Sequence, residues 1–320
     1  ISITNHDIIK DRYPEWVHID NLNKKIAVVW RCLPQGNSLF NYIVTTMDIK
    51  GDSLKQIMKI ESKNGLSIKC SENSSDCIFL GTPDKGLIMI GPDGFEIFGE
   101  AQGCPSNNIL SMAYLNNYLY LGFYGSFAKF DPQTKTFEIL ASYKAIQTKN
   151  DLDGGNLYWI GSMIADTKND SIWFTLFADL KRHGIWKYNP ITGKFILLHH
   201  PYGNRLFFND NGDIVFTIQS QINLLNPQTS EIKLLQGYSW EVVGGLSGFE
   251  IGTHCVMIGK DIIQPTGKLF SDDGNIYNLG KSWLQIEPFG SGAVAVSYYE
   301  TNLNLSLIQP KELITNNNEE

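Results

Sequence analysis

The sequence is dominated by a four-strand pattern that returns about every 40 residues. Its clearest copy has apolar or alternating runs at residues 109–115, 118–122, 127–131 and 137–140, separated by turn residues such as Asn, Gly and Pro. Short runs bounded in this way are typical of β-strands with one or two buried faces. A repeat of this kind restricts the fold strongly, because every copy must build the same unit.

The small residue that ends the second strand of each copy measures the spacing. Five clear copies place it at Gly81, Gly122, Thr175, Thr217 and Gly259. The steps between them are 41, 53, 42 and 42 residues, and weaker copies place it at Thr45 and Ser297. This spacing predicts an all-β fold, a seven-bladed β-propeller of four-stranded antiparallel blades. Six or eight blades are the alternatives.

A single propeller domain is predicted for residues 1–310. Stacked sheets cover each other's faces, and closing the ring covers the outer faces of the first and last sheets. Since closure usually uses a strand from one terminus, we expect an N-terminal strand at residues 16–20 to complete the sheet that contains residues 283–308. Residues 311–320 end in Asn-Asn-Asn-Glu-Glu and are predicted to form a polar tail.

A recurring Asn/Asp-Pro pair marks the turn from the third strand to the fourth. It occurs at Asp131-Pro132, Asn189-Pro190 and Asn226-Pro227, and in each copy a Thr lies two residues after the Pro. The Asn or Asp side chain accepts hydrogen bonds from the turn backbone, and Pro fixes the next φ angle. We therefore interpret this motif as structural and not catalytic.

Charge and composition exclude several classes of protein. The formal net charge is −7, whereas a nucleic-acid-binding protein needs a basic surface to neutralise phosphates. No apolar run approaches the roughly 20 residues of a membrane-spanning helix. The six histidines are scattered, and the adjacent His199 and His200 would point to opposite faces of a strand. We expect no nucleic-acid partner, no membrane-spanning segment, no metal and no other cofactor.

The five cysteines form neither a regular disulfide pattern nor a zinc-type pair. Cys70 and Cys77 are close enough in sequence to face each other across a hairpin. The sequence leaves two alternatives for them, a disulfide in an oxidising compartment or two half-buried free thiols.

Several residues resemble a known repeat. The segment from Cys104 to Ser111, with the later runs 119–122 and 130–134, is similar to the two-component-regulator propeller repeat. Gly81-Thr82 and Gly86-Leu87 preserve its Gly-Thr…Gly-Leu core, and the resemblance extends over about residues 78–235. It implies a relative of the extracytoplasmic sensor halves of bacterial hybrid histidine kinases. The 320 residues include no kinase, receiver or DNA-binding segment, so the resemblance is to the free-standing members. This motif concerns the fold and implies no catalytic residues.

Candidate ligand-binding residues come from the loops that form one mouth of a propeller channel. Arg182 and His183 lie in a long loop after the second strand of one copy, and arginine offers a planar fork for carboxylate or phosphate. Asn108 and Arg205 lie where the first strands of two blades begin. Solvated loops and structural ion pairs are the alternatives for these residues.

Aromatic residues near the loops provide a second kind of candidate. Tyr124 and Trp240 would offer flat faces for sugars or other planar ligands. Packing between blades is the structural alternative for each of them.

The sequence contains no recognisable catalytic constellation. Ser291 lies in a glycine-rich turn that lacks the Gly-x-Ser-x-Gly pattern, and no acid–base pair of carboxylates can be assigned. We expect a non-enzymatic propeller, periplasmic or secreted, that binds a small anionic ligand, a carbohydrate or a protein at one mouth of its channel. The alternatives are a propeller-type polysaccharide lyase or glycoside hydrolase and, for its location, the cytoplasm.

Overall fold

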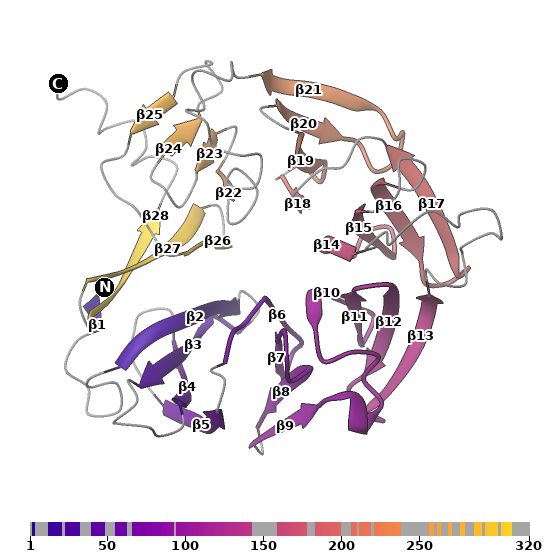
Figure 1. Cartoon of the computed structure of the whole chain (residues 1–320). Helices are drawn as coiled ribbons and strands as arrows, with labels where there is room; N and C mark the ends of the chain where they lie inside the picture. The colour runs from indigo at the N-terminus through magenta and orange to yellow at the C-terminus, as the bar shows by residue number, and fades with distance from the viewer. Residues whose placement is uncertain are drawn as a thin grey trace, which may run out of the picture. The chain divides into compact units, whose positions relative to one another are not determined.

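A computed structural model shows an almost entirely β structure (Figure 1). It describes residues 2–3, 12–20, 23–32, 40–48, 55–62, 66–92, 94–142, 159–177, 183–199, 206–209, 211–218, 221–237, 256–258, 261–263, 268–270, 276–278, 285–289, 292–299 and 302–308. These residues form seven four-stranded antiparallel sheets and one short 3-10 helix, Glu100–Gln102. The all-β, propeller-type fold is therefore confirmed, and the ring of seven blades stays a prediction.

The chain divides into two compact units, and the larger comprises residues 67–208 and 212–248. Its first two sheets contain β6 (Cys70–Asn73), β7 (Ile78–Gly81), β8 (Leu87–Gly91) and β9 (Gly94–Phe98), then β10 (Ile109–Leu115), β11 (Tyr118–Phe123), β12 (Ser126–Asp131) and β13 (Thr136–Ser142). The next two contain β14 (Trp159–Asp166), β15 (Ser171–Phe177), β16 (Gly184–Asn189) and β17 (Lys194–His199), then β18 (Leu206–Phe208), β19 (Ile214–Ile218), β20 (Gln221–Leu225) and β21 (Ile232–Gly237).

Neighbouring sheets of this unit meet along their first strands. β10 packs beside both β6 and β14, and β14 packs beside β18, whereas β13 and β17 lie on the far side of their sheets (Figure 1). The faces between the sheets are filled by buried apolar side chains, with Phe98, Phe130 and Phe137 in contact at the first interface. Phe127, Phe174 and Phe195 fill the second. Neighbouring sheets of this unit therefore bury the faces that they turn to each other, as the repeat predicts.

Glycines allow the close approach of these sheets. A Cβ atom on Gly81 would lie 2.8 Å from the Met112 side chain of the next sheet. One on Gly122 would lie 2.7 Å from Cβ of Ile160, also in the next sheet. Both distances are shorter than van der Waals contact, so these second-strand positions require a residue without a side chain.

The Asn/Asp-Pro turns have the structure expected from the sequence. Oδ1 of Asn189 accepts hydrogen bonds from the backbone N–H groups of Ile191 at 3.0 Å and Thr192 at 2.9 Å. Asp131 and Asn226 accept equivalent bonds in their own turns. Each turn joins the third strand of a sheet to the fourth, so the structural interpretation of this motif is confirmed.

The smaller unit comprises residues 1–66, 209–211 and 249–320. Its sheets contain β2 (Arg12–Asp20), β3 (Lys25–Cys32), β4 (Phe40–Asp48) and β5 (Lys55–Ser62), then β22 (Val256–Ile258), β23 (Asp261–Ile263), β24 (Lys268–Phe270) and β25 (Ile276–Asn278), and finally β1 (Ser2–Ile3), β26 (Gln285–Phe289), β27 (Gly292–Tyr299) and β28 (Asn302–Ile308). The buried indole of Trp30 on β3 donates a hydrogen bond of 2.8 Å to Thr45 on β4.

Three sequence assignments in this unit are wrong. Residues 16–20 do not complete the last sheet, because they lie in β2 and pair with β3; the strand that pairs with β28 is β1. Thr45 lies in a third strand, not a second, and residues 256–258 before Gly259 form a first strand. The apolar runs there were strands, but their order within the sheets was misassigned because each run has neighbours of similar length and pattern.

Candidate functional site

The candidate site lies at one end of two neighbouring sheets, which we call the loop end. There β10 begins with Ile109 opposite Phe123, the last residue of β11. In the next sheet β14 begins with Trp159 opposite Phe177, the last residue of β15. A bridge between Tyr124 and Trp159 joins the two sheets at this end. The register thus places the starts of two first strands and the ends of two second strands together.

Four rings form a continuous series across this end, which we call the aromatic row. The Tyr124 and Trp159 ring centroids are 6.2 Å apart and edge to face. Trp159 stacks on Phe177 at 3.8 Å with an interplanar angle of 13°, and Phe177 meets His183 edge-on at 5.0 Å. Offset-stacked and edge-to-face arrangements are the favoured geometries of aromatic pairs, so each ring holds the next in place.

The aromatic row is accessible to solvent. The side chain of Tyr124 is 47% exposed, and Trp159, Phe177 and His183 are half-buried. Flat rings that are fixed in place and partly exposed can bind the apolar face of a ligand at a small cost in side-chain entropy.

Asn108 adds a polar group to this end. It directly precedes β10, so the register of Ile109 and Phe123 places it across from Tyr124. Its backbone N–H donates to Oγ of Ser106 at 3.1 Å, while its side-chain Oδ1 is buried and has no hydrogen-bond partner within the described structure. A buried carbonyl oxygen without a donor is costly, and a ligand hydroxyl would satisfy it.

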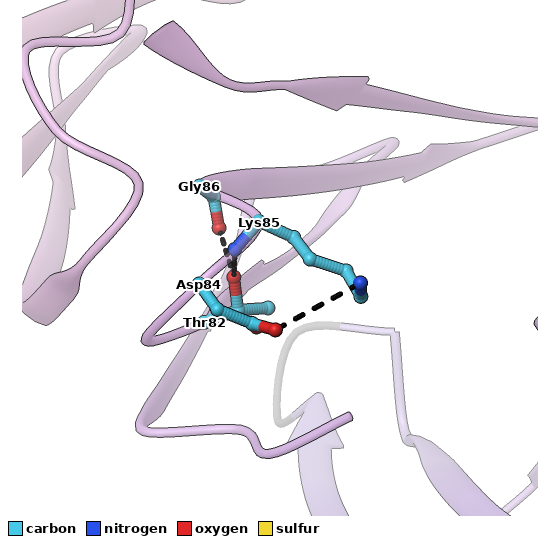
Figure 2. Close-up of polar contacts among 4 residues, drawn as sticks. All are labelled: Thr82, Asp84, Lys85 and Gly86. Carbon is cyan, nitrogen blue, oxygen red and sulfur yellow. Dashed lines mark hydrogen bonds and ion pairs between the residues drawn. The ribbon is translucent and has the colours of Figure 1, made fainter. Parts of the chain in front are cut away.

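The loop of residues 82–86, drawn in Figure 2, forms backbone hydrogen bonds on both sides of Asn108. Oγ1 of Thr82 donates to the Gly86 carbonyl at 2.9 Å and accepts the Lys85 N–H at 2.9 Å. The Gly86 N–H donates to the Asn107 carbonyl, and the Ile109 N–H donates to the Thr82 carbonyl, both at 2.9 Å. Asn108 is therefore bracketed by two backbone hydrogen bonds from one loop.

Gly86 is required by this arrangement. Its φ angle is +81°, and a Cβ atom there would lie 2.2 Å from the Phe98 carbonyl oxygen. Thr82 is fully buried, so its hydroxyl must find partners inside the loop. The Gly-Thr…Gly-Leu core therefore shapes the support beneath the candidate site. The nearby Lys85–Asp84 ion pair, at 3.8 Å, lies at the protein surface (Figure 2).

The segment between β9 and β10 is fixed in the same way. The Glu100 N–H donates to Oδ1 of Asn107 at 2.9 Å, and the Asn107 N–H donates to Oε1 of Glu100 at 3.1 Å. Cys104 lies beneath them, and burial raises the pKa of its thiol to about 11. These residues support the loop, and their polar groups are already engaged with one another.

The structure brings together three of the six sequence-predicted site residues. Asn108, Tyr124 and His183 lie at the loop end, whereas Arg182, Arg205 and Trp240 fall outside the described residues. Sequence reasoning missed Trp159 and Phe177, which connect Tyr124 to His183. The available signal was an aromatic residue at each of two paired strand ends, bordering the two loops that are longer than the repeat requires.

Three other expectations concern cysteines, metals and the membrane. Cys32, Cys70, Cys77 and Cys104 are free thiols, which rules out the Cys70–Cys77 disulfide. In the described ranges, no three His, Cys, Asp or Glu side chains are grouped so that they could hold a metal ion. No helix in the part of the chain that the structure describes has the length and apolar character needed to cross a membrane.

Comparison with known proteins gives the fold and little more. No family model and no curated protein sequence matches the chain. Two solved structures from B. thetaiotaomicron are similar, both extracellular domains of BT4673, described as a "putative one component system" and a "putative hybrid two component system". Their TM-scores are 0.57 and 0.56, at 15% and 16% sequence identity, over 86% and 92% of this chain.

A third similar structure is the computationally designed Ika8 protein, with a TM-score of 0.50 and 11% identity over 93% of this chain and 97% of that one. The chain spans only 37% and 40% of the two BT4673 chains. At these identities the likeness shows a shared fold. The resemblance to the two-component-regulator propeller repeat is thus supported at the level of architecture: the chain is similar in fold to the extracellular domains of such a system.

Proposed function

We propose that this chain is a non-enzymatic propeller that binds a neutral carbohydrate at the loop end and acts outside the cytoplasm. The observation that carries the proposal is the partly exposed aromatic row beside the unpartnered carbonyl of Asn108. Sugars present apolar C–H faces that pack on flat rings and hydroxyl groups that donate to a carbonyl. The extracellular setting of the BT4673 domains supports the location.

The donor requirement favours a neutral sugar over a small anion. Oδ1 of Asn108 is an acceptor only, and a carboxylate or phosphate also accepts hydrogen bonds. An anion would therefore leave this oxygen without a donor. Arg182 and Arg205, on which the anionic alternative depends, lie outside the described residues.

The test is a binding measurement with matched variants. We would titrate the chain with neutral oligosaccharides and with uronic-acid oligosaccharides by calorimetry, then repeat the titration with Tyr124→Ala. Loss of one stacking ring is expected to weaken sugar binding about tenfold, which corresponds to about 1.4 kcal/mol. Phe95→Ala is the control, because Phe95 is 40% exposed and lies on β9 near the opposite end of its sheet.

Three results would contradict the proposal: no binding of any neutral glycan, binding of acidic glycans only, or equal losses of affinity in the Tyr124→Ala and Phe95→Ala variants.

The same samples test the enzymatic alternative. The observation that favours this alternative is the placement of His183 in the aromatic row. Formation of new reducing ends or unsaturated sugars that stops in His183→Ala would indicate a hydrolase or lyase.

A further inference from the structure

The interface between the sheets β14–β17 and β18–β21 lies away from the aromatic row and contains unpartnered polar groups. The two sheets pack through a cluster that includes Trp173 and Ile185 from one side and Phe216 and Leu225 from the other. Pairing across the strands places Lys187 and Ile196 on the same face as Trp173, and Asn223 and Leu234 on the same face as Phe216.

Two N–H donors in this interface have no acceptor. Nε1 of Trp173 and Nδ2 of Asn223 are buried, and neither has a hydrogen-bond partner within the described structure. The Trp173 residue is fully buried and Asn223 is 6% exposed. An indole N–H can only donate, so the missing group is an acceptor. A buried donor without an acceptor is costly, and an incoming oxygen atom would recover that cost.

A cation lies beside the Trp173 donor. Lys187 is paired with Trp173 across the strands, and its Nζ lies 5.0 Å from the Trp173 ring centroid. It is half-buried, and among the residues that the structure describes no carboxylate forms an ion pair with it. The three groups together favour an acceptor that carries a negative charge.

Aliphatic side chains lie on the outer strands next to these polar groups. Ile196 on β17 is 47% exposed and is paired with Lys187; Leu234 on β21 is 52% exposed and is paired with Asn223. The Trp173 donor therefore lies on a second strand, the Lys187 cation and the Asn223 donor lie on third strands, and the exposed aliphatic groups lie on the fourth strands. This order matches a ligand with an anionic head and an apolar tail.

We infer that the interface between these two sheets binds an aliphatic monocarboxylate. Its carboxylate accepts hydrogen bonds from Trp173 and Asn223 beside the Lys187 ammonium group, and its chain packs on Ile196 and Leu234. A buried water molecule would supply an acceptor but no negative charge beside the Lys187 ammonium group and no apolar chain for the exposed aliphatic groups. This site is independent of the carbohydrate proposal, because it shares no residue with the aromatic row.

The test is an octanoate titration followed by NMR. The indole N–H signal of Trp173, assigned by its loss in Trp173→Phe, should shift in a saturable way, whereas octanol, which has the same chain without the charge, should bind at least fivefold more weakly. Lys187→Met should weaken octanoate binding at least fivefold and Lys187→Arg should restore most of it. Lys233→Met is the control, because Lys233 is exposed on β21 and is paired with Leu224, on the other face of that sheet.

The Lys187 variants keep the test valid if a change at Trp173 or Asn223 prevents folding, because Lys187 is only half-buried. An unchanged Trp173 signal would overturn the inference and leave a buried water as the acceptor. Equal affinities in the Lys187 and Lys233 variants would also overturn it. Failure of octanoate binding would not affect the sugar titration at Tyr124, so the two proposals fail separately.

Discussion

The two ends of the sheets in residues 67–237 are built on different principles. At the turn end, opposite the loop end, several polar groups are paired with each other, although the buried Oγ of Ser171 has no partner within the described structure. The carboxylate of Asp166 accepts from the backbone N–H groups of Lys168 and Asn169, both at 3.1 Å, and Nδ2 of Asn116 donates to Asp170 of the next sheet at 2.9 Å. At the loop end, rings are partly exposed and Asn108 keeps an unpartnered oxygen. The turn end therefore carries carboxylates bonded to the turn backbone, whereas the loop end carries partly exposed aromatic rings.

The largest expected effect comes from the loop beneath the site. Gly86→Ala forces a side chain into a left-handed conformation and against the Phe98 carbonyl, and should lower the free energy of unfolding by about 3 kcal/mol. Gly193→Ala at the turn end is the control. Its φ angle is +67° with nothing within 4 Å of an added Cβ, so only the conformational cost of about 1 kcal/mol applies. Urea unfolding of both variants checks this; equal losses would mean that the loop rearranges freely.

The second-largest loss of unfolding free energy is expected at the turn end. Asp166→Ala removes the acceptor of two backbone bonds and of the Asn169 side chain, at 2.8 Å, and should cost about 2 kcal/mol of unfolding free energy. Asp166→Asn keeps one carbonyl acceptor and should lose less. Because this end has no part in the proposed binding, sugar affinity should be unchanged in both variants when measured well below the unfolding temperature. A loss of affinity would contradict the division between the two ends.

Asn108→Ala should separate binding from stability. The substitution removes the side-chain amide, and with it a buried oxygen that has no donor. The free energy of unfolding should therefore stay the same or rise by up to about 1 kcal/mol, while sugar binding weakens. Paired denaturation and calorimetry measure the two quantities. A loss of more than about 1 kcal/mol would show that Asn108 is a structural residue like those of the turn end.

The smallest effect concerns thiol reactivity beneath the loop end. Burial raises the pKa of Cys104 to about 11, so its thiolate is scarce in the folded chain at pH 8 and alkylation should be at least about tenfold slower than in urea. Because the folded pKa lies above the unfolded value, this thiol favours the folded state below the unfolded pKa and loses that contribution as the pH rises towards 11. Peptide mass spectrometry at pH 8 and pH 10 reads the labelling. Fast labelling at pH 8 would show that the segment of residues 99–107 opens readily.

How much the sequence predicts depends on the range of the interactions. The Asn189-Pro190 and Asp131-Pro132 turns were predictable, because a side chain and the backbone two or three residues later determine them. The last sheet was not, because its additional strand consists only of Ser2 and Ile3, too short to show any alternation.

The candidate site was predictable residue by residue but not as a group. Tyr124 and His183 each stood out as loop residues, yet 58 positions separate them and two further rings join them. Strand register and packing between sheets bring them together, and neither quantity can be read from a single segment. The unpartnered oxygen of Asn108 is likewise a property of its surroundings.

Gly81 and Gly122 also have a consequence for how such a chain could change in length. At Gly81 and Gly122 the neighbouring sheet begins where a first side-chain carbon would be, so glycine there sets how closely consecutive sheets approach, whereas Thr175 holds the matching position of the following sheet. A bulkier residue would push the inner strands apart and change the angle between the sheets. A unit copied into the chain would therefore bring its own small residue at this position, and with it the spacing to the next sheet.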